Sequence, residues 1–131
     1  MSRVYEMRFV ASIDDIDVMG HVNNAVWVRW MEQVAAAQWR ALAPAEAQAH
    51  YAWVVTRHEI DYRGNVREGQ AVMARTHVAD PPRGARFDRV IEFTGPDSRL
   101  LVAARTTWAM IEQSSGRLVR VPNELAAIFL R

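Results

Sequence analysis

The hydrophobic positions change their period near residue 50, and this change predicts one long helix followed by strands. Between residues 25 and 40, Trp27, Trp30, Met31 and Val34 recur at the spacing of one helical face. From residue 51 onwards apolar and polar positions alternate, as they do in half-buried strands. The apolar face of the helical segment is wide, so we expect the rest of the chain to wrap around it.

The same patterns place the remaining elements. We expect a shorter helical or irregular connection from Pro44 to about His50, and a short helix opened by Pro122. The predicted strands cover residues 3–12, 51–62, 70–79, 85–94, 100–111 and 117–121. Antiparallel strands joined by short turns form a meander. We therefore predict a single α+β domain over residues 1–131, with an antiparallel sheet of about five to six strands around one long helix. The open edges of such a sheet favour a homodimer.

Composition removes several classes of partner and of chemistry. The formal net charge is +1, from 16 basic and 15 acidic residues, so nothing in it calls for nucleic acid or an anionic membrane. The chain has no cysteine, which excludes disulfides, thiolate metal sites and a cysteine nucleophile. Charges at Arg3, Glu6 and Arg8 leave no apolar stretch for a signal peptide, and the longest apolar runs are too short to span a bilayer. We expect a cytoplasmic protein.

The chemistry gathers in the polar loop before the long helix, residues 14–24, which reads DDIDVMGHVNN. The sequence has no G-x-S-x-G elbow, no phosphate loop and no pair of histidines at metal-ligand spacing. A hard-cation site of Asp14, Asp15 and Asp17 is conceivable, but the spacing of a calcium loop is missing. We therefore expect neither a metal nor a cofactor.

A carboxylate placed just before a helix N-terminus suits acyl transfer or hydrolysis. The free N–H groups of the helix can hold an oxyanion, and the carboxylate can attack a carbonyl or activate water. The simpler interpretation is that these acids and asparagines, with Asn23 and Asn24 as candidate N-caps, only cap and solvate the helix. The residues alone leave both readings open.

Residues 15–32, DIDVMGHVNNAVWVRWME, resemble the signature D-x-D-x-x-G-x-V-x-x-x-x-Y-x-x-W-x-E of hotdog-fold acyl-CoA thioesterases of the 4-hydroxybenzoyl-CoA type. The resemblance extends in outline over the whole chain. It implies a hotdog fold, hydrolysis of an acyl-CoA without a metal, and a homodimer or dimer of dimers with active sites between subunits. The segment HVNN also resembles acyl-ACP thioesterases, so an ACP-linked substrate is an alternative. A hotdog protein that binds acyl-CoA without turnover is another.

The resemblance also implies roles for residues of the loop and the helix start. Asp17 matches the catalytic carboxylate, as nucleophile or general base, and His21 matches a catalytic histidine of the acyl-ACP relatives. The backbone N–H of Asn24 would face the thioester oxygen. Gly20 permits the turn and close approach of the thioester. Trp27 replaces the usual tyrosine, which would change the acyl pocket without removing the chemistry, and a core position is the simpler interpretation of this residue.

Further substrate contacts are expected outside this motif. His58 and Tyr62 lie on the strand where the resemblance places the partner subunit near the site. Arg83, Arg86 and Arg89 cluster in sequence, and arginines favour the phosphates of CoA. An ordinary charged loop and strand face is the simpler interpretation of those arginines.

Overall fold

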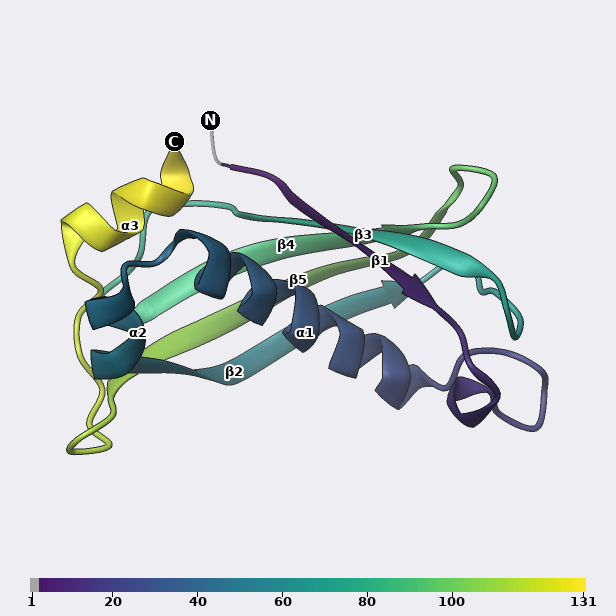
Figure 1. The fold of residues 1–131 in the computed structure, drawn as a ribbon, viewed down its shortest axis with the longest axis horizontal. Helices are drawn as coiled ribbons and strands as arrows, with labels where there is room; N and C mark the ends of the chain where they lie inside the picture. Colours follow the sequence, from purple (N-terminus) through teal and green to yellow (C-terminus); the bar gives the residue numbers. More distant parts are fainter. Residues whose placement is uncertain (1–2) are drawn as a thin grey trace.

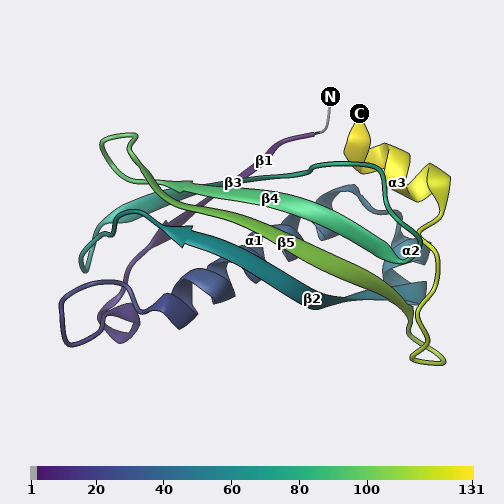
Figure 2. The same cartoon turned by 180° about the vertical axis from the view of Figure 1, so that it is seen from behind.

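One long helix lies against one face of an antiparallel sheet in the computed structural model, which describes residues 3–131 (Figure 1). The helix is α1 (Asn24–Leu42). The five strands are β1 (Tyr5–Val10), β2 (Tyr51–Tyr62), β3 (Ala71–Val78), β4 (Arg86–Thr94) and β5 (Leu100–Glu112). Seen from behind, the sheet lies in front of α1 (Figure 2). This arrangement confirms the α+β class and the hotdog fold that the resemblance implied.

The strand order is β1-β3-β4-β5-β2, and every neighbouring pair is antiparallel. A meander is therefore correct for β3, β4 and β5 alone. The chain enters β2 directly after the helices, and this strand pairs with β5 and forms one edge of the sheet. The other edge is β1, so both edge strands flank a central meander.

The shorter elements close the ends of this layer. Helices α2 (Ala45–His50) and α3 (Asn123–Leu130) are as expected, and a 3-10 turn, η1 (Ile13–Asp15), forms the start of the polar loop. The predicted strand at residues 117–121 is wrong. Only an isolated bridge joins Leu118 to Ile111, because the chain turns away from β5 to reach α3. No helix in residues 3–131 combines the length and apolarity needed to cross a bilayer.

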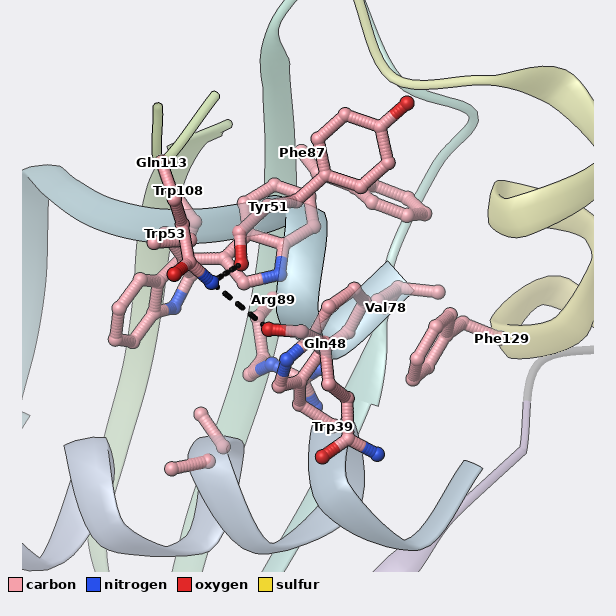
Figure 3. A pocket seen from close by; sticks show the side chains of 13 residues that line it. Trp39, Gln48, Tyr51, Trp53, Val78, Phe87, Arg89, Trp108, Gln113 and Phe129 are labelled. Atoms are coloured by element: carbon pink, nitrogen blue, oxygen red, sulfur yellow. Dashed lines mark hydrogen bonds between the residues drawn. The ribbon is translucent and has the colours of Figure 1, made fainter. Parts of the chain in front are cut away.

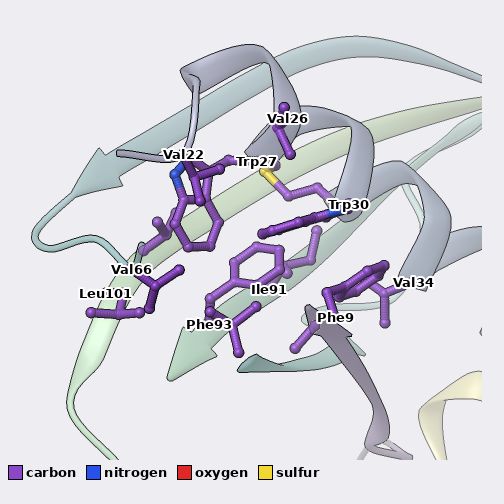
Figure 4. Close-up of a cluster of buried hydrophobic side chains, with 14 of the residues drawn as sticks. Phe9, Val22, Val26, Trp27, Trp30, Val34, Val66, Ile91, Phe93 and Leu101 are labelled. Atoms are coloured by element: carbon purple, nitrogen blue, oxygen red, sulfur yellow. The ribbon is translucent and has the colours of Figure 1, made fainter. Parts of the chain in front are cut away.

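The N-terminal half of α1 is held to the sheet by aromatic packing (Figure 4). Trp27 is fully buried, and its ring centroid lies 5.3 Å from that of Trp30 and 5.0 Å from that of Phe93. Phe9 of β1 stacks on Trp30 at 5.2 Å. Burying a large aromatic side chain stabilises a fold by about 1.5–3 kcal/mol. This cluster therefore fixes the start of α1, and with it the polar loop that leads into the helix.

Candidate functional site

The loop before α1 is a short antiparallel ladder that returns the chain to the helix start. The N–H of Asp17 donates to the carbonyl of His21 at 2.8 Å, and the N–H of Asn23 donates to the carbonyl of Asp15 at 2.9 Å. Gly20 forms the turn with φ of +78°, a conformation that glycine adopts without strain. The ladder places Asp17 opposite His21, both exposed, at the N-terminal end of α1.

The two carboxylate oxygens of Asp17 have different surroundings. Oδ1 accepts hydrogen bonds from the backbone N–H groups of Met19 at 2.9 Å and His21 at 3.2 Å. Oδ2 has no hydrogen-bond donor among residues 3–131. One oxygen thus fixes the carboxylate in the loop, while the other remains available for chemistry.

The first residue of α1 has an unpaired backbone N–H, in the part of the chain described, where the loop enters the helix. The side chain of Asn23 caps the helix by accepting from the N–H of Ala25 at 2.9 Å, and its carbonyl accepts from the N–H of Val26 at 2.9 Å. Asn24 is the first helical residue, and its N–H has no acceptor in the part of the chain described. Because a helix N-terminus carries partial positive charge, this N–H suits a carbonyl oxygen that becomes negative.

Asp15 anchors the loop to α1. Its carboxylate accepts from the N–H and the hydroxyl of Ser12, at 2.9 and 3.0 Å, and from Arg29 Nη2 at 2.8 Å. Burial raises the pKa of Asp15, but the hydrogen bonds from Ser12 and Arg29 and the charge of Arg29 outweigh burial and leave this pKa below its usual value. Asp15 is therefore an ionised structural residue that fixes the loop against α1.

Two residues from the connection after β2 complete the surroundings of the loop. Asn65 Oδ1 accepts from the N–H groups of Val22 and Val66, each at 2.9 Å. Arg67 lies against Gly20, since a Cβ on this glycine would be 2.9 Å from Arg67 Nη1. Sequence reasoning missed both residues. They are more than 40 positions from the loop, and no periodic or motif signal marks them.

Of the two predicted contacts on β2, His58 belongs to a polar group apart from the Asp17 loop, and Tyr62 lies at the end of the strand. His58 Nδ1 lies 2.8 Å from Thr106 Oγ1, and its Nε2 lies 3.9 Å from Glu32 Oε2, which makes an ion pair when His58 is protonated. Tyr62 ends β2 and is 43% exposed, and partial burial raises the pKa of its hydroxyl. Neither His58 nor Tyr62 hydrogen-bonds to Asp17 in the part of the chain described.

Trp27 lies in the core, and the arginine cluster does not gather at one place in the fold. Trp27 is fully enclosed in the core and has no surface to offer a substrate. Arg83 pairs with Asp88 at 3.4 Å, and Arg83 and Arg86 form a bridge at the end of the sheet near α3, away from the Asp17 loop (Figure 1). Arg89 is buried under α1, because it lies on the helix-facing side of β4. The three arginines therefore form no common phosphate site within one chain.

Known proteins share this fold. The sequence profile of the thioesterase-like superfamily matches residues 11–129. A search of curated protein sequences finds no match. A thioesterase from Thermus thermophilus, solved with coenzyme A and Zn, has a TM-score of 0.83 at 22% identity, with 98% of each chain covered. Among residues 3–131 here, no cluster of three or more His, Asp or Glu could hold a metal ion.

Two further structures are longer than this chain. An acyl-ACP thioesterase from Bacteroides thetaiotaomicron has a TM-score of 0.84 at 18% identity, covering 98% of this chain and 54% of that one. A provisionally assigned oleoyl thioesterase from Lactobacillus plantarum has a TM-score of 0.86 at 20% identity, covering 98% and 51%. This chain thus spans about half the length of each. Because the profile covers most of the sequence and the fold agrees with it, this chain belongs to the thioesterase-like superfamily.

Proposed function

We propose that this protein is a thioesterase that hydrolyses an acyl-CoA to a carboxylic acid and free CoA. One observation supports this most: the free Oδ2 of Asp17 lies in the loop that leads into α1, at whose start the N–H of Asn24 is also free. A carboxylate needs an oxyanion donor nearby to act on a thioester. Family membership supports the same reaction.

The proposed reaction uses only groups of the loop and the helix start. The thioester oxygen accepts from the N–H of Asn24. Oδ2 of Asp17 then attacks the carbonyl carbon, or it takes a proton from a water that attacks. The C–S bond breaks, and the sulfur leaves as the CoA thiolate and is protonated. In the first route water hydrolyses the resulting anhydride, and both routes yield the acid. His21, opposite Asp17, is the second candidate for proton transfer.

The two routes differ in where solvent oxygen goes. In the nucleophilic route, single turnover in H₂¹⁸O places label in the Asp17 carboxylate when water attacks the carboxylate side of the anhydride. In the general-base route the label appears only in the product acid. Label found by mass spectrometry in the peptide that contains Asp17 would establish the nucleophilic route.

A second copy of this chain belongs to the proposal. β2 is an edge strand, so its outer backbone groups can pair with another strand. We propose a homodimer, or a dimer of dimers, with each site between subunits. In such an assembly His58, Tyr62, Arg83 and Arg86 are the residues that one subunit offers to the Asp17 loop of another.

The test is release of free thiol from a panel of aliphatic and aromatic acyl-CoAs. The protein has no cysteine, so it adds no thiol background. Turnover of one or more acyl-CoAs supports the proposal, and the best of them identifies the acyl class. An acyl-ACP thioesterase has a similar fold, so acyl-ACPs form a second panel. If only acyl-ACPs are hydrolysed, the protein is an acyl-ACP thioesterase. If acyl-CoA binds tightly without turnover, the protein is a binding protein and not a thioesterase.

A further inference from the structure

A cavity of about 310 Å³ lies beneath the C-terminal half of α1, far from the Asp17 loop of the same chain. Its α1 residues, Ala35, Ala36 and Trp39, lie about 16–23 Å along the helix axis from Asn24, at 1.5 Å per residue. The opposite wall comes from β2, β4 and β5, with Phe129 of α3 at one end. A volume of this size is in the range of small-molecule sites.

Six of the thirteen residues that line the cavity are aromatic, and one, Arg89, is charged. Tyr51, Trp53, Phe87 and Trp108 join Trp39 and Phe129 around the cavity, and Figure 3 shows Arg89 at the centre of this group. The walls therefore suit a ligand with an apolar body. Arg89 needs a separate explanation.

Arg89 is a buried cation without a counter-ion. It is 7% exposed, and no Asp or Glu lies within ion-pair distance of it in residues 3–131. Burial lowers its pKa to about 10, so the guanidinium is still charged at neutral pH. A buried charge that lacks a partner costs several kcal/mol. A buried charge with this cost points to a functional role for the guanidinium, such as binding an anionic ligand.

Only one of the three guanidinium nitrogens of Arg89, Nη1, donates hydrogen bonds to described residues. Nη1 donates to Gln38 Oε1 of α1 and to Thr76 Oγ1 of β3, the latter at 3.0 Å. These neutral acceptors orient the guanidinium from behind. Nε and Nη2 have no acceptor among the described residues, and neither is among the fully enclosed unpartnered atoms, which are the indole nitrogens of Trp27 and Trp108. The remaining N–H groups are thus left for an acceptor that enters the cavity.

We infer that this cavity binds a carboxylate with an apolar aromatic or medium-chain aliphatic body, with the carboxylate on Arg89 and the body between the aromatic walls. The planar guanidinium matches a carboxylate in geometry, and the pair neutralises the buried charge. Phosphate fits this site less well, because it is strongly hydrated and the apolar walls offer it few donors. Binding of a free acid requires no thioester chemistry, so the inference stands apart from the proposed hydrolysis.

The test is calorimetric titration of the whole protein with 2-naphthoate and with octanoate, each compared with its primary amide. The amide keeps the apolar body and removes the negative charge. We expect each acid that fits to bind at least about tenfold more tightly than its amide, because charge-assisted hydrogen bonds are the stronger kind. The two bodies distinguish an aromatic from an aliphatic ligand.

Two variants assign binding to the cavity. Arg89→Gln should abolish the preference for acid over amide. Ala36→Phe fills the cavity and should remove binding of both, while Ala41→Phe, on an exposed position of the same helix, should leave binding unchanged. The inference is overturned if neither acid binds, if amides bind as tightly as acids, or if Ala36→Phe binds like the wild type. If Arg89→Gln does not fold, the comparison of acid with amide and the comparison of Ala36→Phe with Ala41→Phe still test the inference.

Discussion

Asp15 and Asp17 are two residues apart, yet their carboxylates have opposite surroundings. Asp15 is buried and bonded to Ser12 and Arg29, whereas Asp17 is exposed and holds the loop with one oxygen only. At the scale of the residue, an acid becomes structural when all its bonding is satisfied within the fold. It becomes a candidate for chemistry when one oxygen remains free in a fixed position.

Asp15→Asn should loosen the loop without removing the proposed catalytic group. We expect unfolding free energy to fall by about 1 kcal/mol at pH 7, because the ion pair with Arg29 is lost. The pKa of Asp15 is lower in the folded state, so its stabilisation is present above about pH 4 and disappears as pH falls through the folded pKa. Urea titrations at about pH 7 and about pH 2.5 check this. Asp14→Asn, at an exposed neighbour, is the control, and an equal loss in both variants would contradict the role of Asp15.

Single residues were predictable where the relevant contacts are local in sequence. Asp17, Gly20 and Asn24 lie within one motif, so spacing alone brings them to the helix start. Asn65 and Arg67 reach the same loop through the fold, and only β2 places them there. The sequence predicts a cluster of Arg89 with Arg83 because the two are near in the chain. Strand alternation instead points the side chain of Arg89 toward α1.

At the scale of the element, two neighbouring residues divide the work at the start of α1. Asn23 caps the helix, and the N–H of Asn24 is the proposed oxyanion donor. Asn24→Pro removes the free N–H, and proline is tolerated at the first helical position. Asn23 before it has φ of −60° and ψ of 139°, which a following proline accepts. We expect kcat to fall about 10²–10³-fold with a stability change under about 1 kcal/mol.

Asn24→Ala is the matched control for this change, because it keeps the N–H and removes only the side chain. Its kcat should stay within a few-fold of the wild type. Steady-state kinetics and a thermal melt of both variants test the idea. A folded Asn24→Pro enzyme with normal kcat would rule out this N–H as the oxyanion donor.

The elements themselves were predictable where the period is long and clear. The twelve-residue strand β2 matches the predicted residues 51–62, and α1 extends the predicted helix by one residue at its start and two at its end. The segment at residues 117–121 has the composition of a strand. Strand composition does not reveal whether a neighbour is available, and here the chain leaves the sheet for α3. The position of β2 beyond β5 was missed for the same reason, since pairing is a long-range property.

At the scale of the whole molecule, the exposed edge of β2 bears on assembly. Val54 is 41% exposed on this edge strand, and Val10, on the opposite edge strand β1, is 46% exposed. If two copies pair along β2, Val54→Asp should disrupt the pairing by placing like charges at the interface, and thiol release should fall with it. Val10→Asp should change neither. Light scattering with parallel assays measures both, and a wild-type monomer with full activity would contradict the shared site.

The central claim concerns the carboxylate of Asp17, and the most direct measurement compares two isosteric variants. Asp17→Asn and Asp14→Asn each remove one exposed negative charge from the same segment, but only the first removes the free Oδ2. On the best acyl-CoA of the panel, we expect thiol release to fall at least about 10²-fold in Asp17→Asn while binding of acyl-CoA persists. Asp14→Asn should retain the wild-type rate. Undiminished turnover by a folded Asp17→Asn protein would contradict the account.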